Sequence, residues 1–133
     1  MTRTVLFLCP HNAAKSVMAE SLFNTRAGAR NVGWEAASAG TEPSPAVSPA
    51  VVELLTERNL PAPAHAPRRV TVEQMDAAEC VVSLGCRPEE LPARVDDLEM
   101  WDDVPLPGAD LTGSYAAIQR HVDELLDHLE TIA

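Results

Sequence analysis

The sequence lacks the features that mark membrane, secreted and nucleic-acid-binding proteins. No apolar run approaches the about 20 residues that a membrane-spanning helix needs. Residues 1–4 lead into a short apolar run rather than into a signal peptide. Basic residues are scarce, since 10 lysines and arginines stand against 20 aspartates and glutamates, for a net charge of -10. Nucleic acid and anionic membranes both need a positive face, so we expect neither as a partner and place the chain in the cytoplasm.

Cysteine and histidine are also few. The three cysteines are an odd number and form no short pair of the kind that binds metals. The four histidines include His121 and His128, which fall in a predicted final helix, and none has a partner spaced for a metal site. We therefore expect no metal and no other cofactor. Free thiols also fit a reducing compartment better than a disulfide framework does.

The chain does contain a regular alternation of strand and helix patterns. Apolar runs typical of buried strands cover residues 5–8, 34–39 and 80–84, and helical periodicity covers 14–26, 49–59, 72–78 and 112–132. We predict an α/β fold: one domain over residues 1–133, a doubly wound sheet of about four parallel strands, right-handed crossovers and helices on both faces.

The ends of three helices have local signals. A glycine-rich break over residues 27–33 is predicted to follow the first helix. Ser48 before Pro49 predicts a helix start with a hydroxyl cap and a proline at the first helical position. Thr71 and Gln74 have the spacing of a capping box.

The junction between the first strand and the first helix carries the most chemistry. Cys9 ends the strand, and Lys15 and Ser16 open the helix after a short loop. Free amides and the positive end of the helix dipole favour anions at such a place, so the loop can bind an oxyanion and lower the pKa of a thiol. Cys9 would then be the nucleophile, Lys15 the cation over the oxyanion, and Ser16 a hydroxyl donor to the thiolate. The alternative is that Cys9 is a small, inert packing residue.

The loop resembles that of the low-molecular-weight protein tyrosine phosphatases and of the thioredoxin-coupled arsenate reductases built on the same fold. That family has an apolar strand, then a Cys-x5-Arg-Ser loop with Asn at the third position after Cys. Cys9, Asn12 and Ser16 match it, and Lys15 stands where the family has Arg. The resemblance implies a phosphate-binding loop after the first strand, whose oxyanion-binding residues are His11, Asn12, Ala13, Ala14, Lys15 and Ser16.

Four later segments are similar to the same family, in the same order along the chain. They are residues 38–41 (Ser-Ala-Gly-Thr), 65–68 (His-x-Pro-basic), 81–86 (the strand that delivers a second cysteine) and Trp101-Asp102 (the start of an acidic loop). We expect His65, in the second of these segments, to be a structural or surface histidine.

Cys86 is expected just past the end of the third strand, at the edge where open parallel sheets bind ligands. If strands one and three are neighbours, Cys86 and Cys9 rise from the same side of the sheet. The resemblance then implies that Cys86 is the resolving thiol; the alternative is a loop thiol without a role. Cys80, at the other end of that strand, is expected to be a packing residue.

The expected proton donor is missing. In the family an Asp before a Pro assists proton transfer at this point. Counting from Trp101 to Gly108, the Asp-Pro pair falls on Pro105-Leu106. Asp103 could take its place only through a local shift.

Three functions are compatible with these residues. The first is an arsenate reductase-like enzyme, in which Cys9 attacks arsenate and Cys86 displaces arsenite. Cys86 would then pass the oxidation to Cys80, to a small thiol or directly to a thioredoxin-like protein, and an external thiol regenerates the enzyme. Cys86 favours it. The second is a phosphatase that hydrolyses phosphotyrosine through a phosphocysteine, which the missing Asp weakens. The third is a non-catalytic oxyanion-binding or redox-sensing relative, because Lys15 replaces a bidentate arginine and Pro10 removes a backbone donor.

Overall fold

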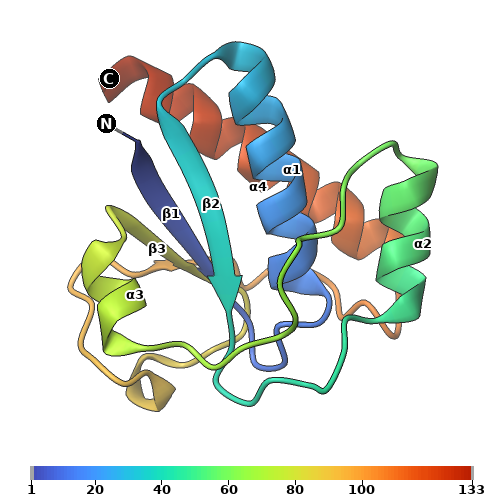
Figure 1. The fold of residues 1–133 in the computed structure, drawn as a ribbon, viewed down its shortest axis with the longest axis horizontal. Helices are drawn as coiled ribbons and strands as arrows, with labels where there is room; N and C mark the ends of the chain where they lie inside the picture. Colours follow the sequence, from blue (N-terminus) through green and yellow to red (C-terminus); the bar gives the residue numbers. More distant parts are fainter. Residues whose placement is uncertain (1, 133) are drawn as a thin grey trace.

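A parallel sheet forms the centre of the molecule in the computed structural model, which describes residues 2–132. Its four strands are β1 (Arg3–Leu8), β2 (Trp34–Ala39), β3 (Cys80–Ser83) and β4 (Glu99–Met100). All neighbouring pairs are parallel, and the order across the sheet is β2-β1-β3-β4. Figure 1 shows β2, β1 and β3 side by side. The predicted α/β fold with about four parallel strands is confirmed.

Helices cover both faces of this sheet, as predicted. The helices α1 (Lys15–Arg30), α2 (Pro49–Glu57) and α4 (Leu111–Ile132) lie on one side, and the short α3 (Val72–Ala77) lies on the other (Figure 1). A single 3-10 turn, η1 (Pro88–Glu90), follows β3. Within residues 2–132, no helix combines the length and apolar character needed to cross a membrane.

Side-chain alternation along β1 determines which face of the sheet carries the first cysteine. Val5, Phe7 and Cys9 pack into the core cluster that the sheet shares with α1, α2 and α4, whereas Leu6 and Leu8 pack into the cluster under α3. Successive strand residues point to opposite faces, so this division follows from the backbone pleat. The sulfur of Cys9 therefore lies on the α1 side.

The same alternation holds in β3. Val82 and Leu84 pack with the α1 cluster, and Cys80 lies against it, while Val81 packs with the α3 cluster. The pleat of the backbone accounts for this division of the strand as well. Cys86, beyond the strand, belongs to the α3 cluster.

The first helix runs further than predicted. The prediction that a break over residues 27–33 ends this helix is wrong at its start, because α1 continues through Gly28 to Arg30. Ala27 is buried in the core, and the helix ends only where Asn31 adopts a left-handed conformation with φ of 55°. The amides of Asn31 and Val32 then donate to the last carbonyls at 3.2 Å. Asparagine tolerates this conformation, so it ends the helix where the glycine does not.

Two predicted caps have different outcomes. The capping box is confirmed: the Gln74 amide donates to the Thr71 hydroxyl at 3.1 Å, and the Thr71 amide donates to the Gln74 side chain at 3.0 Å. The helix start at Pro49 is also confirmed, but the Ser48 hydroxyl makes no capping bond. Ser48 instead donates its backbone amide to the carbonyl of Ala13 at 2.9 Å, which ties the start of α2 to the loop after β1.

The last helix is confirmed almost to the residue. Five apolar residues spaced three and four apart along this segment are buried in α4: Tyr115, Ile118, Val122, Leu125 and Leu129. Ile132, the next residue of the same series, is 53% exposed at the end of the helix.

Gly40, directly after β2, supports the loop that follows β1. A Cβ at this position would lie 2.6 Å from the carbonyl oxygens of both Cys9 and Pro10. The Gly40 amide donates to Arg68 and its carbonyl accepts from Val70, both at 2.9 Å, so the peptide cannot move aside without losing these bonds. Only glycine permits such a close approach of two backbone segments.

Replacing this glycine should disturb the loop more than an equivalent change elsewhere. We expect Gly40→Ala to lower the free energy of unfolding by about 1–3 kcal/mol, the usual cost of overpacking. Gly28→Ala is the matched control, because nothing lies within 4 Å of its added Cβ, and it should stabilise α1 by up to about 1 kcal/mol. Urea denaturation of both variants measures the difference. Equal stabilities would contradict the packing argument.

Candidate functional site

The sulfur of Cys9 faces the first turn of α1. The Ser16 amide donates to this sulfur at 3.4 Å, and the Ser16 hydroxyl oxygen lies 3.0 Å from it. The N-cap residue Ala14 offers no side-chain acceptor, and the first turn holds no acid. The sulfur therefore satisfies an amide that the helix leaves free. A negative charge is favoured at this position, because the helix dipole presents its positive end there.

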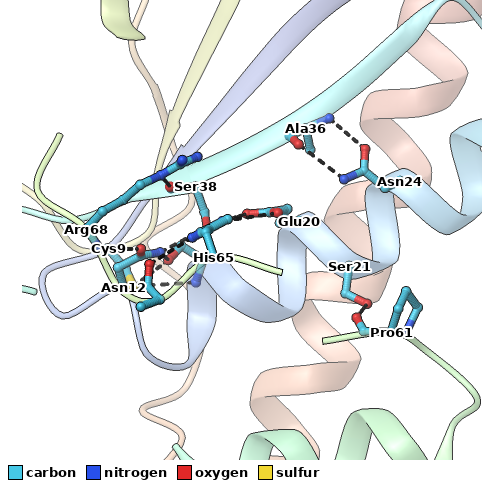
Figure 2. Close-up of polar contacts among 12 residues, drawn as sticks. Cys9, Asn12, Glu20, Ser21, Asn24, Ala36, Ser38, Pro61, His65 and Arg68 are labelled. Atoms are coloured by element: carbon cyan, nitrogen blue, oxygen red, sulfur yellow. Dashed lines mark hydrogen bonds and ion pairs between the residues drawn. The ribbon is translucent and has the colours of Figure 1, made fainter. Parts of the chain in front are cut away.

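The side chain of Asn12 stabilises the conformation of the loop that follows β1. It is fully buried and has φ of 48°, a conformation that asparagine tolerates. Its amide group donates to the hydroxyls of Ser16 at 2.8 Å and Ser38 at 2.9 Å, and its oxygen accepts from the Arg68 amide at 3.1 Å (Figure 2). One side chain thus joins the loop, the end of β2 and the connector that precedes α3.

A buried carboxylate continues this network away from the sulfur. The Ser38 hydroxyl donates to Glu20 at 2.5 Å, and Nε2 of His65 lies 2.9 Å from the same carboxylate oxygen (Figure 2). Nδ1 of His65 lies 2.9 Å from the Ala66 carbonyl. Both ring nitrogens therefore face acceptors. These contacts fit the structural role expected for His65, and they place it at the outer end of a chain of contacts that leads to Cys9.

Sequence reasoning missed Glu20, and it identified Ser38 only as part of the segment 38–41, without a place in the site. The available signal was a carboxylate on the buried face of the first helix, because Glu20 lies one helical turn after Ser16. Buried charges need partners, so such a position indicates a polar network.

A cavity of about 300 Å³ opens above Cys9. Among the predicted site residues, Cys9, His11, Ala13, Ala14 and Lys15 line it, together with Pro10, Ser44, Leu106 and Pro107. Asn12 and Ser16 lie fully buried behind the sulfur instead. The only ionisable lining side chains are those of Cys9, His11 and Lys15. A larger hollow of about 550 Å³ lies over residues 88–98, but no cysteine lines it.

Lys15 extends from the helix start toward the turn after β3. A Cβ built on Gly85 would lie 3.2 Å from the Lys15 ammonium nitrogen. Gly85 has φ of +112°, a backbone conformation that other residues rarely adopt. The turn therefore combines an unusual backbone with the space that the ammonium group needs.

Cys86 lies past the end of β3, where it was predicted. β1 and β3 are neighbours, so both cysteines follow the same edge of the sheet. Cys86 is fully buried, and the Thr41 hydroxyl lies 3.8 Å from its sulfur. Burial raises the pKa of the Cys86 thiol; the contact with Thr41 lowers it, and the Cys9 sulfur raises it further. Cys86 packs on the α3 face and does not line the Cys9 cavity.

Cys80 is separated from Cys86 in two ways. It pairs with Val5, at the far end of the sheet, and it lies against the cluster on the opposite face. The three strand steps from Cys80 to Ser83 span about 10 Å, beyond the about 7 Å that a disulfide can bridge. Burial raises the pKa of Cys80 to about 11, with a smaller contribution from Glu99.

Asp103 lies away from the cavity. Its carboxylate lies 2.6 Å from Nε2 of His121 and accepts from Arg120 at 2.9 Å. The contact with His121 is the main cause that holds the pKa of Asp103 below its usual value. A carboxylate with a lowered pKa is a poor proton donor near neutral pH. Asp103 does not line the cavity, so the structure does not bring it together with Cys9. Leu106 and Pro107 line this part of the cavity instead.

Comparisons with known proteins agree with this geometry. The family model for low molecular weight phosphotyrosine protein phosphatase matches residues 4–101. The arsenate reductase from Archaeoglobus fulgidus is 32% identical with a TM-score of 0.67, over 94% of this chain and 97% of that one. A thioredoxin-dependent arsenate reductase from Corynebacterium glutamicum is 25% identical with a TM-score of 0.84; the match covers 99% of this chain and 64% of that one, so this chain spans less than two thirds of that protein. A low molecular weight protein tyrosine phosphatase from T. tengcongensis shares the fold. It is 23% identical with a TM-score of 0.85, over 96% of this chain and 99% of that one.

The contacts of Asn12 predict that its side chain stabilises the loop independently of its backbone conformation. Asn12→Gly keeps access to positive φ and loses three hydrogen bonds, which should cost about 1.5–4 kcal/mol of unfolding free energy. Asn12→Ala should cost about 1 kcal/mol more, because alanine resists this backbone conformation. Urea denaturation of the two variants separates these contributions. If Asn12→Gly were as stable as the wild type, the network would not hold the loop.

The three thiols should differ in reactivity. With a pKa of about 11, about one Cys80 thiol in a thousand is ionised at pH 8, and only thiolates react with iodoacetamide. Burial slows Cys86 as well, whereas Cys9 lines an open cavity. We expect mass spectrometry of the native protein to find Cys9 alkylated first. In urea the three rates should converge, and labelling of native Cys80 ahead of Cys9 would contradict the assignment.

Proposed function

The chain belongs to the low molecular weight phosphotyrosine protein phosphatase family, which contains phosphatases and arsenate reductases, and on that basis we propose that it is a thiol-dependent arsenate reductase. The observation that carries this choice is a second cysteine, Cys86, past the same edge of the sheet as Cys9. The relatives from Archaeoglobus fulgidus and Corynebacterium glutamicum, at 32% and 25% identity, are both described as arsenate reductases.

In this proposal the loop after β1 binds a tetrahedral oxyanion, arsenate or its analogue phosphate, over the Cys9 sulfur. Lys15 supplies the positive charge, and the backbone from His11 to Ser16 supplies amide donors, with Asn12 holding their arrangement. The Ser16 hydroxyl, 3.0 Å from the sulfur, stabilises the thiolate. The overall charge of -10 repels anions, so binding depends on these local donors.

The reaction then proceeds through two thiol steps. The Cys9 thiolate forms a sulfur–arsenic bond and an oxygen of arsenate leaves as water. The Cys86 thiol loses its proton and attacks the Cys9 sulfur, so that a disulfide forms and the sulfur–arsenic bond breaks. Arsenic gains the two electrons that the two thiols lose, and arsenite leaves.

The second step requires the turn after β3 to move, because Cys86 packs on the α3 face in the resting protein. Gly85, with φ of +112°, lies within this turn. Burial raises the pKa of Cys86, which keeps it a neutral thiol until an adduct forms on Cys9.

An external reductant must regenerate the two thiols. Cys80 is too distant from Cys86 to accept the disulfide within the chain, at the opposite end of β3 and against the opposite face. A thioredoxin-like protein or a small thiol fits this role, and a reducing compartment such as the cytoplasm would supply either one.

The absence of a carboxylate from the cavity lining favours this function over phosphatase activity. Hydrolysis of a phosphocysteine needs a group that takes a proton from the attacking water. Within the described part of the chain, the cavity lining offers Leu106 and Pro107 and no carboxylate for this step. Reduction resolves its adduct with a thiol instead of water.

Cysteine variants test the proposal. Wild-type protein with arsenate and a dithiol should oxidise the dithiol, whereas Cys9→Ser should abolish this activity and Cys86→Ser should reduce it at least about 100-fold, since a missing nucleophile removes its whole step. Cys80→Ser is the matched control and should retain activity.

Parallel assays with an aryl phosphate distinguish the alternatives. Hydrolysis that needs Cys9 but not Cys86, without arsenate-dependent thiol oxidation, would identify a phosphatase. Oxyanion protection of Cys9 from alkylation with neither activity would identify a binding module. Either result would contradict the proposed reductase.

A further inference from the structure

The proton source for the first chemical step is not explained by the roles described so far. An oxygen that leaves a tetrahedral oxyanion carries negative charge unless it receives a proton in the transition state. The family position for an acid is occupied by uncharged residues here, and Asp103 is paired with His121 and Arg120. Among the described residues that line the cavity, His11 and Lys15 are the only ionisable side chains besides Cys9 itself.

We propose that His11 is the proton donor to the leaving oxygen at the Cys9 site. This inference rests on the proposed function. His11 is the second residue after Cys9, lines the same cavity, and is exposed to solvent, from which it can be protonated again. Histidine is the side chain whose ordinary pKa lies closest to neutral pH, so it suits proton transfer there.

Hydrogen bonds determine which nitrogen of the ring can act. Nδ1 of His11 lies 3.1 Å from the Glu42 carbonyl oxygen, which can only accept. Nδ1 therefore carries a hydrogen, and Nε2 is the nitrogen that gains and loses a proton. No described residue bonds to Nε2, so it is available to a substrate in the cavity.

The backbone holds His11 in this position. The Glu42 amide donates to the Pro10 carbonyl at 2.7 Å, and the Ser44 amide donates to the His11 carbonyl at 3.0 Å. These bonds and the Nδ1 contact attach the loop to the segment after β2. The ionisable groups around the ring are Cys9 and Lys15 in the cavity and the exposed side chain of Glu42.

Lys15 is the weaker candidate for this role. Its positive charge is what attracts the oxyanion, so loss of its proton would weaken binding at the moment of reaction. The ordinary pKa of a lysine ammonium is also about 10, far above neutral pH. Binding by Lys15 and proton transfer by His11 divide the two tasks between separate groups.

The proposed step is balanced. The Cys9 sulfur forms a bond to arsenic, one arsenic–oxygen bond breaks, and the Nε2 proton moves to the departing oxygen, which leaves as water. No electrons change hands in this step, and the neutral His11 recovers a proton from solvent. Reduction of arsenic occurs only when Cys86 attacks the Cys9 sulfur.

His11→Asn tests the assignment, because the asparagine amide can still donate to the Glu42 carbonyl but cannot titrate. We expect kcat to fall about 100-fold or more, the usual contribution of a general acid, with KM changed less than about threefold. The limb of the pH–rate profile that reports this acid should disappear. His128→Asn, an exposed histidine outside the cavity, is the matched control and should keep wild-type kinetics.

A second assay keeps the test independent of arsenate reduction. With aryl phosphates, the loss caused by His11→Asn should be large for phenyl phosphate and small for 4-nitrophenyl phosphate, whose leaving group needs little protonation. If the wild type hydrolyses these esters but does not reduce arsenate, the proposed function fails while this comparison still decides the role of His11.

Three results would overturn the assignment. They are wild-type kcat and pH profile in folded His11→Asn, equal losses for the two esters, and a wild type without either activity, which would overturn the proposed function as well. Far-UV circular dichroism and urea denaturation establish that the variant folds. If it does not, His11→Gln, which can place an amide near the position of Nε2, takes its place with the same expected outcomes.

Discussion

The contact between the Cys9 sulfur and the start of α1 is the constraint on which the site depends. A helix begins with free amides, and this one has no side-chain cap, so the Ser16 amide turns to the sulfur. The Ser16 hydroxyl faces the same atom, and Asn12 holds that hydroxyl from behind. A sulfur in this position lies where negative charge is stabilised, at the mouth of a cavity that an anion can enter.

Contacts from distant parts of the chain keep this arrangement rigid. Gly40 supports the loop backbone at close approach, Ser48 ties α2 to Ala13, and Arg68 donates to the Asn12 side chain. The buried polar groups would each cost free energy without a partner, so they are stable only when all of them are in place. The loop is thereby organised before a ligand arrives, which lowers the cost of binding.

Local patterns in the sequence predicted most of the fold. Apolar runs predicted β1, β2 and β3, and the helical periodicity of residues 112–132 predicted α4 almost to the residue. β4 could not be located because it has two exposed residues, Glu99 and Met100, and exists only through pairing with β3.

Site features that depend on long-range packing were less predictable. Cys9, Asn12 and Ser16 lie close together in sequence, so the loop pattern could reveal them. The approach of His65 to Glu20 joins a proline-rich connector to a helix, and the pairing of Asp103 with His121 joins a loop to α4. Neither pair has a sequence spacing that a local rule could detect, because tertiary packing alone brings the partners together.

Lys15 is where the local and long-range constraints meet. It is the only lysine in a chain whose other nine cationic side chains are arginines. Arginine would grip an oxyanion with a planar, bidentate fork, whereas an ammonium group is a point charge on a flexible stem. Lys15 lines the cavity over Cys9, and its ammonium group lies against Gly85, the residue before Cys86. Any movement of Lys15 toward an anion on Cys9 therefore changes what packs against the turn that carries the second thiol.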